Sequence, residues 1–367
     1  MLTWDLLVGR FIWMDGLKRG IFTSHSVLLT NLIGPPGLLL HFLTCILFGK
    51  GLPPVDSSIL SMDNDNSEAS TDIIAVRSNN KQATAGATKT PVFRAESVIQ
   101  PLLPNLLSST SDEARIALLA LCDESTVWEY TNDSNPSIVG RDAIEKMLSD
   151  RSKNFPSNAR IVIDKVAAGS TSCGFTFHLA QEGVQGKGLR STIFFEFSQA
   201  NEKSEKKKIA YVREVAEPLF KPGAATSKLL RAVVSEAVKK DPSLAIRPPT
   251  PSRRTTSSAP DLCRYLWTEV NGSDKELTLG LFDENIIYED FNFPKPFVGK
   301  AEVSDFLDEF DIPGIRFIPE RFTDGPKGST SCCFTWRVEL AGVAQSTRGI
   351  SFYELGWHTC NVYKRYS

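Results

Sequence analysis

The chain has 367 residues, of which 41% are hydrophobic and 23% are charged, and its formal net charge is −2. This length allows two or three domains with their own cores, and the composition is that of a folded, mostly soluble protein. Because acidic and basic residues balance and no basic stripe is interleaved with aromatic residues, we expect no nucleic-acid partner.

An uncharged apolar run lies near the start of the chain, at residues 27–48, which read VLLTNLIGPPGLLLHFLTCILF. Its length suits the roughly 20 residues that cross a bilayer core, and the central Gly-Pro-Pro-Gly break is tolerated in membrane helices. A kinked buried helix is one alternative. A signal sequence fits poorly, because charged residues precede the run and no small-residue cleavage site follows it. We therefore predict a membrane segment over residues 1–51.

Two charged residues, Asp5 and Arg10, precede that run in the same segment. Charges at membrane depth are usually paired and often functional, and a salt link across one turn is the simpler alternative. The stretch DLLVGR at residues 5–10, followed by GPPGLL at residues 34–39, resembles the C-terminal half of the neoxanthin-synthase-like family. Those are plastid membrane proteins named for abscisic-acid deficiency. The resemblance implies a plastid (chloroplast) membrane location and only the last one or two of about four membrane helices.

Two linkers divide the rest of the chain. Residues 52–94 are rich in Ser, Asn, Asp, Ala and Thr, and they have too few large apolar residues to offset the entropy of ordering, so we predict a flexible tether. Residues 241–260 are rich in Pro, Ser and Thr and form a second linker. We therefore expect a first domain with a trailing helix at residues 95–240 and a second domain at residues 261–367.

These two domains repeat each other. The pentapeptide GSTSC at residues 169–173 recurs at residues 328–332, and FFEF in the first copy matches FYEL in the second. Other matched pairs run in the same order: Glu129 with Glu289, Arg190 with Arg348, and the segment VGR with VGK. We conclude that one module was duplicated. We also predict that Arg190 and Arg348 form cross-strand ion pairs with the nearby Glu196 and Glu354.

Each copy begins with helices, continues with a short strand and a further helix, and ends with alternating strands such as FTFHL and FTWRV. Helices followed by an antiparallel sheet predict an α+β fold. The last twelve or so residues of the chain match nothing in the first copy, so we expect the second domain to lack its last strand. Either another chain completes it, or the 3′ end of the gene is misread, which we favour because an open edge is a liability.

The pattern of helix, LFDENIIYED, VGK, helix and long strands resembles the SnoaL-like branch of the nuclear transport factor 2-like superfamily. The resemblance implies two cone-shaped domains in tandem, each with three helices on a bent sheet around an apolar pocket. Such domains host isomerases, cyclases, dehydratases and binders, so the fold alone does not choose a function. It also implies a homodimer through the sheets.

Candidate catalytic residues lie in the first copy. His178 stands on the polar side of FTFHL and Glu129 follows an aromatic residue, so either side chain could act as an acid or base in an apolar pocket. A solvated or structural histidine and an outward-facing carboxylate are the simpler alternatives. Arg337 occupies the place of His178 in the second copy. Candidate ligand contacts are the residues of the short strands and the facing strands, namely Trp128, Tyr130, Tyr211, Arg213, Tyr288, Glu289, Trp336 and Arg337.

No CxxC pair occurs among the seven cysteines and the four histidines are scattered, so we predict neither a metal site nor a cofactor. Burying an unpaired Arg337 in an apolar pocket is costly. We therefore expect the polar side chains of FTWRV and FTFHL to face away from the pockets. We therefore predict a membrane-anchored plastid protein that binds an apolar small molecule, such as a carotenoid or another isoprenoid. An isomerase or cyclase that uses His178 or Glu129, and a dimerising scaffold, are the alternatives.

Overall fold

The computed structural model describes residues 93–130, 137–198, 207–340, 343–356 and 362–366. Residues 86–367 form one compact unit. The predicted membrane segment with Asp5 and Arg10, and most of the first predicted linker, lie outside the described residues. Of the helices that are described, none combines the length and the apolar character that crossing a membrane requires.

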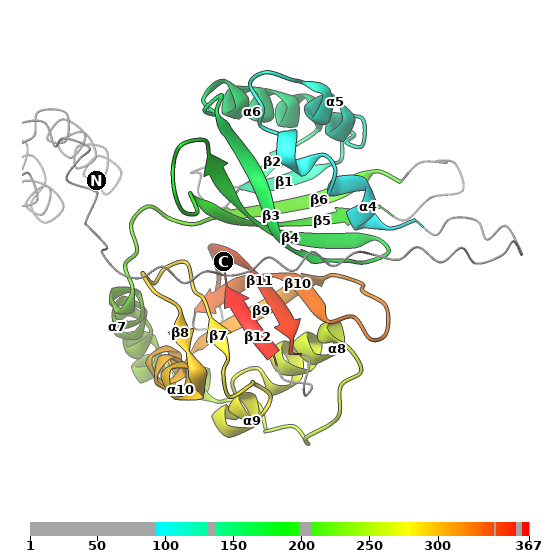
Figure 1. The fold of residues 1–367 in the computed structure, drawn as a ribbon. Coiled ribbons are helices and arrows are strands. Elements are labelled where there is room, and N and C mark those ends of the chain that lie inside the picture. Colours follow the sequence, from blue (N-terminus) through cyan, green and yellow to red (C-terminus); the bar gives the residue numbers. More distant parts are fainter. Residues whose placement is uncertain (1–92, 131–136, 199–206, 341–342, 357–361, 367) are drawn as a thin grey trace, which may run out of the picture. The chain divides into compact units, whose positions relative to one another are not determined.

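Residues 95–216, the first module, form short helices followed by a sheet (Figure 1). Their helices are α4 (Ala95–Ile99), η2 (Leu103–Asn105), α5 (Glu113–Leu119) and α6 (Arg141–Lys153). The strands are β1 (Val127–Tyr130), β2 (Ser137–Val139), β3 (Ala159–Ala167), β4 (Ser172–Gln181), β5 (Arg190–Phe197) and β6 (Ile209–Ala216). They form one six-stranded sheet in the order β2-β1-β6-β5-β4-β3, in which only β1 and β6 run parallel.

Residues 259–366, the second module, repeat this order of elements. The helices are α8 (Ala259–Arg264), η4 (Tyr265–Val270), α9 (Lys275–Gly280) and α10 (Gly299–Phe310). The strands are β7 (Ile287–Tyr288), β8 (Phe297–Val298), β9 (Ile315–Phe322), β10 (Ser331–Leu340), β11 (Val343–Leu355) and β12 (Val362–Tyr366). The last four form a sheet in the order β12-β11-β10-β9, and β7 pairs with β8. Together the modules have a mixed α+β fold, as the sequence predicted.

The last strand that we expected to be missing is present in the structure. β12 pairs antiparallel with β11, from Ser351 opposite Tyr366 to Leu355 opposite Val362. The expectation was wrong because it relied on a match with the first copy, whereas a strand ladder is made by backbone hydrogen bonds that many sequences provide. VYKRY also contains one β-branched and two aromatic residues, which are common in strands.

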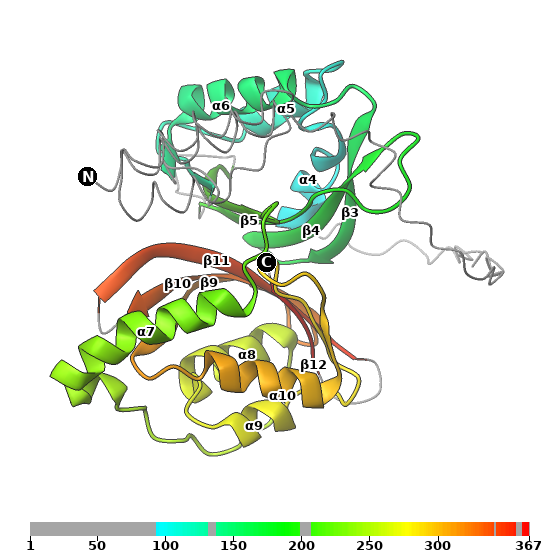
Figure 2. The same cartoon turned by 90° about the vertical axis from the view of Figure 1, so that its left-hand side faces the viewer.

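The trailing helix predicted for the first domain packs on the second module. This helix, α7 (Ala224–Lys240), lies beside α10 in Figure 2. Arg231 donates to the carbonyl oxygens of Asp308 (3.3 Å) and Glu309 (3.0 Å) at the end of α10. Val234 is buried, and its side chain approaches Gly314 in the second module. The segment that follows β6, residues 217–258, is called the connecting segment below; it also includes η3 (Pro242–Ala245).

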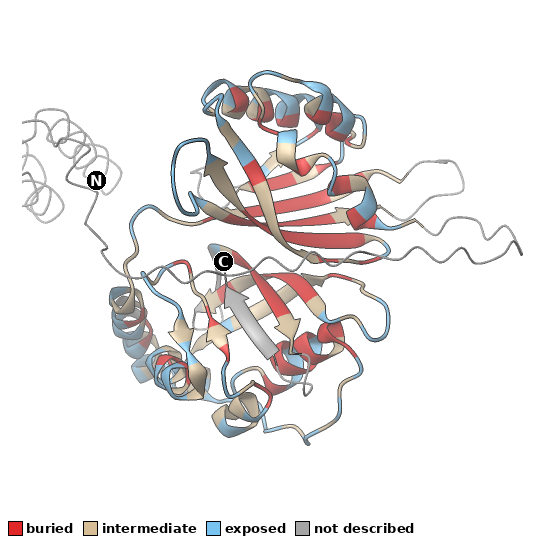
Figure 3. Cartoon of the chain, in the orientation of Figure 1, coloured by how far each residue is buried: buried red, intermediate tan, exposed pale blue. Residues whose placement is uncertain are grey.

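Glycine starts the long helix of each module at the same matched position. Gly140 precedes α6 with φ +91°, and Gly299 is the first residue of α10 with φ +83°. Both angles lie in the left-handed region that side chains with a Cβ rarely adopt. The VGR and VGK segments therefore turn the chain from a short strand into a helix, which covers one face of the sheet, and the buried residues gather between the two (Figure 3).

The other faces of the two sheets contact each other through a small apolar cluster formed by Ala167, Phe194, Tyr211, Cys333, Ile350 and Phe352. Gly174 of β4 lies against Cys333 of β10, and a Cβ on Gly174 would come within 2.2 Å of the Cys333 Cβ. Gly174 and Cys333 are matched positions, because each directly follows a copy of GSTSC. The two sheets therefore contact each other through equivalent positions.

Ion pairs across this contact join each arginine to the glutamate of the opposite module. Arg190 of the first module pairs with Glu289 of the second at 2.7 Å, and Arg348 of the second pairs with Glu129 of the first. The predicted ion pairs with Glu196 and Glu354 are therefore wrong, although Arg190 also pairs with Glu217 just after β6, at 2.8 Å. The strand faces that carry these residues point toward the other module, so the oppositely charged partner is supplied by that module.

A second set of contacts follows the same exchange. Glu196 pairs with Arg321 at 2.9 Å, and Glu354 pairs with Lys165. Lys165 lies opposite Thr176 in its ladder and Arg321 lies opposite Thr335, so these two cations occupy matched positions as well. Reciprocal contacts of this kind are typical of an isologous interface between two identical subunits.

Candidate ligand-binding site

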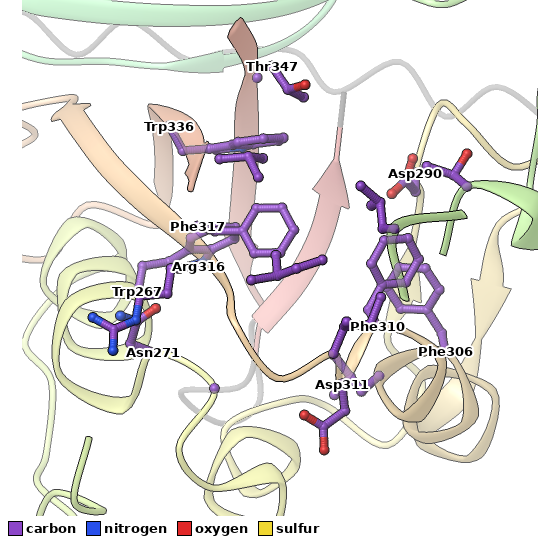
Figure 4. Close-up of a pocket in the computed structure, with 18 of the residues that line it drawn as sticks. Trp267, Asn271, Asp290, Phe306, Phe310, Asp311, Arg316, Phe317, Trp336 and Thr347 are labelled. Atoms are coloured by element: carbon purple, nitrogen blue, oxygen red, sulfur yellow. The ribbon is translucent and has the colours of Figure 1, made fainter. Parts of the chain in front are cut away.

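A cavity of about 880 Å³ lies mainly in the second module, and Glu129, Val215 and Ala216 of the first module also line it (Figure 4). It is enclosed by η4, α10, strands β9 to β11 and the connecting segment. The inner wall is made of large apolar side chains, chiefly Leu266, Trp267, Phe306, Phe310, Phe317 and Trp336. In Figure 4, Trp336 and Thr347 lie at the top of the cavity, and Asn271 and Asp311 lie at the bottom. The volume is within the range of roughly 300–1,000 Å³ that is usual for small-molecule sites.

Three aromatic rings on one side of the cavity are packed against each other. Trp267 and Trp336 are stacked with their centroids 6.3 Å apart, and Phe317 meets Trp336 edge to face at 5.3 Å. The indole N–H groups have partners outside this stack: Trp267 donates to the Tyr353 hydroxyl (2.6 Å), and Trp336 donates to Ser351 Oγ (3.0 Å). With their polar atoms satisfied, the rings can offer apolar surface to a ligand.

Gly349 allows Trp336 to lie in this position. It is the ladder partner of Trp336 on β11, and a Cβ added there would come within 2.1 Å of the indole ring. The matched residue of the first module is Ser191, which lines the cavity of that module. The absence of a side chain at residue 349 therefore provides the space for the large ring that forms the top of the second cavity.

The connecting segment forms part of the cavity wall. Thr226 and Leu230 from α7 line it, and so do residues 244–248 after that helix. Gly223, just before α7, donates to the Asn292 carbonyl oxygen of the second module at 2.9 Å. The second cavity is thus closed by residues that the sequence analysis assigned to the first domain and to the linker.

Glu129, a predicted catalytic residue, lies at the edge of this cavity and both its oxygen atoms are engaged. One oxygen accepts hydrogen bonds from the Tyr211 hydroxyl (2.6 Å) and from Arg213 Nε (2.7 Å), and the other pairs with Arg348. Glu129 is only 6% exposed. Both carboxylate oxygens are therefore bound to protein donors, namely two guanidinium groups and a phenol.

Tyr211 and Arg213, predicted ligand contacts, lie in the contact between the modules. Burial, together with the adjacent Glu129, raises the pKa of Tyr211 well above its ordinary value. Burial alone would lower the pKa of Arg213, but its anionic neighbours outweigh that effect and its pKa is raised. Arg213 also donates to the Trp336 carbonyl oxygen (2.9 Å) and to Glu320 (2.7 Å) in the second module. These groups join the two modules.

His178, the other predicted catalytic residue, lines neither cavity. Its Nδ1 is 3.0 Å from an oxygen of Asp164, which also accepts from Lys187 at 2.7 Å. Burial would raise the pKa of Asp164, but the hydrogen bonds from Lys187 and His178 prevail and lower it. Phe175 and Phe177, on the other side of the strand, belong to the core of the first module. Among the described contacts of His178, none reaches Glu129 or Tyr211.

The remaining predicted ligand contacts are distributed over several places. Trp128 is fully buried in the first-module core, and Tyr130 lines a cavity of that module. Tyr288 lines the second cavity and packs on Phe306 at 4.7 Å, and burial raises its pKa well above 10. Glu289 is paired with Arg190. Arg337 pairs with Glu320 (3.6 Å) and Glu339 (3.0 Å) and does not line the cavity.

A cavity of about 930 Å³ in the first module contains an ion pair that the sequence analysis missed. Arg151 of α6 and Glu214 of β6 line it and are joined by two hydrogen bonds of 2.7 and 2.8 Å. The sequence did carry a signal, because Arg151 follows Ile144 and Leu148 on the buried face of α6. Likewise, Arg213 and Glu214 are adjacent in the apolar strand β6, so they must point to opposite faces of the sheet and one of them must face the helices.

In the described part of the chain, no cluster of three or more His, Cys, Asp or Glu residues is placed to hold a metal ion. A family model described as "ABA DEFICIENT 4-like" matches residues 1–41, which confirms the resemblance noted in that segment. The match covers a small part of the chain. A search of curated proteins finds no match to this chain.

Several solved structures are similar to parts of the chain. A candidate isomerase of the SnoaL-like family from Agrobacterium tumefaciens is 14% identical, with a TM-score of 0.27, and the match covers 34% of this chain and 97% of that one. A candidate ketosteroid isomerase from Kribbella flavida is 14% identical, with a TM-score of 0.24 and coverages of 34% and 78%. An NTF-2-like protein of unknown function from Pseudomonas aeruginosa is 14% identical, with a TM-score of 0.25 and coverages of 32% and 91%.

Identities this low carry no statement about activity. The chain therefore combines a segment that matches the ABA DEFICIENT 4-like family at residues 1–41 with an α+β region that is similar to SnoaL-like and NTF2-like structures.

Proposed function

We propose that this chain is a membrane-anchored plastid protein whose second module binds an apolar small molecule, an isoprenoid such as a carotenoid. The observation that carries the binding proposal is the aromatic cavity of about 880 Å³ in the second module. Burial of an apolar ligand against such walls contributes roughly 25 cal/mol for each Å² removed from water, so the walls alone can supply affinity.

Binding is favoured over acid–base catalysis by the state of the ionisable groups. Glu129 at the cavity edge is fully engaged with Tyr211, Arg213 and Arg348. His178, the alternative base, is paired with Asp164 away from both cavities. A general base must come within hydrogen-bond reach of the proton that it removes, and His178 does not line the second cavity. Glu129 does line it, but both its oxygens are already bound to protein donors.

The membrane and plastid parts of the proposal rest on the N-terminal segment. Residues 1–41 match the ABA DEFICIENT 4-like model, and residues 27–48 are uncharged and apolar in sequence. The neoxanthin-synthase-like resemblance of this segment links it to carotenoid chemistry. A cavity module tethered beside a membrane would receive an apolar ligand directly from the lipid, where such molecules are stored.

The cavity is tested by isothermal titration calorimetry of the full-length chain with limonene, an isoprenoid hydrocarbon that carries no oxygen. Leu230→Trp fills the cavity from α7 and should weaken binding at least about ten-fold, whereas Ala232→Trp, on the exposed side of the same helix, should not change it. Equal binding by both variants, or no binding by the unaltered chain, would contradict the proposal.

The anchor is tested by membrane fractionation. The full-length chain should remain in the pellet after carbonate extraction, whereas a chain that begins at Gly86, the start of the compact unit, should be released. A full-length chain that appears in the supernatant after carbonate treatment would contradict the membrane anchor and leave the cavity result untouched.

A further inference from the structure

The cavity of the first module differs from the second in one central feature, the ion pair between Arg151 and Glu214. Its other walls are mostly apolar and include Met147, Phe155, Phe177 and Leu179, while Lys146, Asp150 and Asn154 of the α6 region add polar groups. From these observations we infer a second and separate binding site in the first module. It takes an apolar, uncharged ligand that carries a ketone, aldehyde or hydroxyl oxygen, and Arg151 donates a hydrogen bond to that oxygen.

The geometry of the ion pair leaves donors available to a ligand. Arg151 uses Nη1 and Nη2 to bind the two oxygens of Glu214, at 2.7 and 2.8 Å. A guanidinium group has five N–H donors; the contact with Glu214 engages two of them, and Nη1 also donates to Met147 Sδ at 4.0 Å, which leaves two donors. The Arg151 side chain is 26% exposed while that of Glu214 is 3% exposed, so the arginine is the member of the pair that a molecule in the cavity can reach.

Glu214 and Tyr130 hold Arg151 in place. The bidentate contact fixes the plane of the guanidinium group, and the Tyr130 ring lies under it, with Arg151 Cζ 4.9 Å from the ring centroid. Burial alone would lower the pKa of Arg151, but Glu214 outweighs that effect and its pKa is raised. The donor is therefore charged and oriented before a ligand arrives, which reduces the entropy lost on binding.

The ion pair is not required to build a cavity of this kind. Matched positions line both cavities: Met147 with Phe306, Phe177 with Trp336, Leu179 with Val338, and Ser191 with Gly349. At the position of Arg151 the second module has Phe310, which packs on Phe306 at 4.8 Å. Well-packed apolar residues usually stabilise a protein as well as a buried ion pair does. Since apolar residues at these positions would stabilise the fold equally well, we infer that the Arg151–Glu214 pair serves to bind a ligand.

The charge of the site selects the class of ligand. Arg151 and Glu214 together are neutral, and both lie in a mostly apolar cavity. A free carboxylate would compete with Glu214 for Arg151 and bring two anions together, which is unfavourable at low local polarity. A neutral carbonyl or hydroxyl oxygen can accept from Arg151 without displacing Glu214. The first cavity is thus suited to an oxygenated apolar molecule.

The experiment uses the full-length chain with Leu230→Trp, so that the second cavity is filled and binding reports on the first. Calorimetric titrations compare 2-undecanone with undecane, which has the same carbon skeleton without the oxygen. We expect the ketone to bind about ten-fold more tightly than the alkane, as one hydrogen bond to a charged donor provides. Titration with 2-undecanol then distinguishes a hydroxyl ligand from a carbonyl ligand.

The critical variant is Arg151→Met with Glu214→Leu, which removes both charges together and so leaves neither one buried without its partner. It should abolish the preference for the ketone and leave the affinity for undecane unchanged. Arg151→Lys keeps the ion pair but has fewer oriented donors, so it should give an intermediate preference for the ketone. This single variant keeps the inference testable if the double variant does not fold. Equal affinities for ketone and alkane before any change at residue 151, or an unaltered preference in either variant, would overturn the inference. Because the second cavity is filled throughout, these outcomes are independent of the proposed function.

Discussion

The two cavities are lined by matched positions and yet differ in chemistry. The first has Arg151 and Tyr130 where the second has Phe310 and Asp290, so the helix position is charged in the first module and aromatic in the second. The second cavity is also closed by the connecting segment, which lines it from Thr226 onward. The comparison shows that one helix position and one linker can change the side chains that line a cavity, while the strand positions around it stay matched.

The contact between the modules shows a similar mixture of likeness and difference. Ser172 donates to the Phe322 carbonyl oxygen (3.3 Å), and its match Ser331 donates to the Val166 carbonyl oxygen (3.0 Å). Asp324 breaks this reciprocity, because by the ladder pairing its counterpart in the first module is Ala168. We propose that the second module occupies the place that a second copy of the chain would take in a homodimer formed through the sheets.

The largest predicted effect is at Arg213, whose side chain is 1% exposed and contacts Glu129 and Glu320. Arg213→Met leaves two carboxylates without this partner in the contact between modules. We expect a loss of about 3–5 kcal/mol in the free energy of unfolding, measured with urea. Arg321→Met is the matched control: its ion pair with Glu196 is more than one-third exposed, so we expect a loss of about 1 kcal/mol or less. Similar losses in the two variants would show that Arg213 is not a special link between the modules.

Asp324 provides the next effect, since it has no acidic counterpart in the first module. Its carboxylate accepts from the backbone and hydroxyl groups of Thr171 and Ser172, at 2.8 to 3.0 Å. Asp324→Asn should lower the free energy of unfolding by about 1–3 kcal/mol at pH 7. Burial would raise the pKa of Asp324, but these hydrogen bonds prevail and lower it.

The sign of the pH dependence follows from that lowered pKa. The stabilisation by Asp324 is fully present above its unfolded-state pKa, about 3.9, and is lost as the pH falls through the folded-state value. Urea unfolding at pH 7, 4 and 3 should therefore show that the difference in stability between the unaltered chain and the Asp324→Asn variant shrinks toward acid. A difference that stays constant over this range would mean that the carboxylate charge contributes nothing.

Gly349 and Ser191 test the matched ladder position in the two cavities. Gly349→Ala places a Cβ within 2.1 Å of the Trp336 ring and should cost about 1–3 kcal/mol in stability, with weaker binding of limonene. Ser191→Ala keeps a Cβ that is already present and should change stability by about 0.5 kcal/mol or less. Thermal unfolding and calorimetry of both variants provide the comparison, and equal effects would show that residue 349 does not position Trp336.

Much of the fold could be predicted from the sequence, because local patterns determine it. The alternation of FTFHL and FTWRV placed Phe175 and Phe177 on the core side, and the VGR and VGK segments marked the starts of α6 and α10. The α+β class followed from the order of these elements. Information of this kind is available from the spacing of apolar residues alone.

The candidate sites were harder to predict, because they depend on which faces meet. Glu129 and Arg213 were chosen as residues of a pocket, but the faces of the sheets that carry them contact each other, so their charges are matched across the modules. Arg151 and Glu214 were missed because their pairing joins a helix and a strand that are far apart in the sequence. The docking of α7 on the second module likewise results from long-range packing that no local pattern contains.

The smallest predicted effects concern the two reciprocal ion pairs. A double-mutant cycle with Arg190→Gln and Glu289→Gln should give a coupling energy of about 0.5–1 kcal/mol, because Arg190 keeps a second partner, Glu217, at 2.8 Å. The mirrored cycle, with Arg348→Gln and Glu129→Gln, should give a larger coupling, because the Glu129 side chain is only 7% exposed. Unfolding in urea with about 0.05 M and about 1 M NaCl should reduce the first coupling more than the second, since salt screens exposed charges more than buried ones. If the two couplings are equal and respond equally to salt, the contact between the modules is symmetric in energy as well as in position. The difference between the modules then lies only in their cavities.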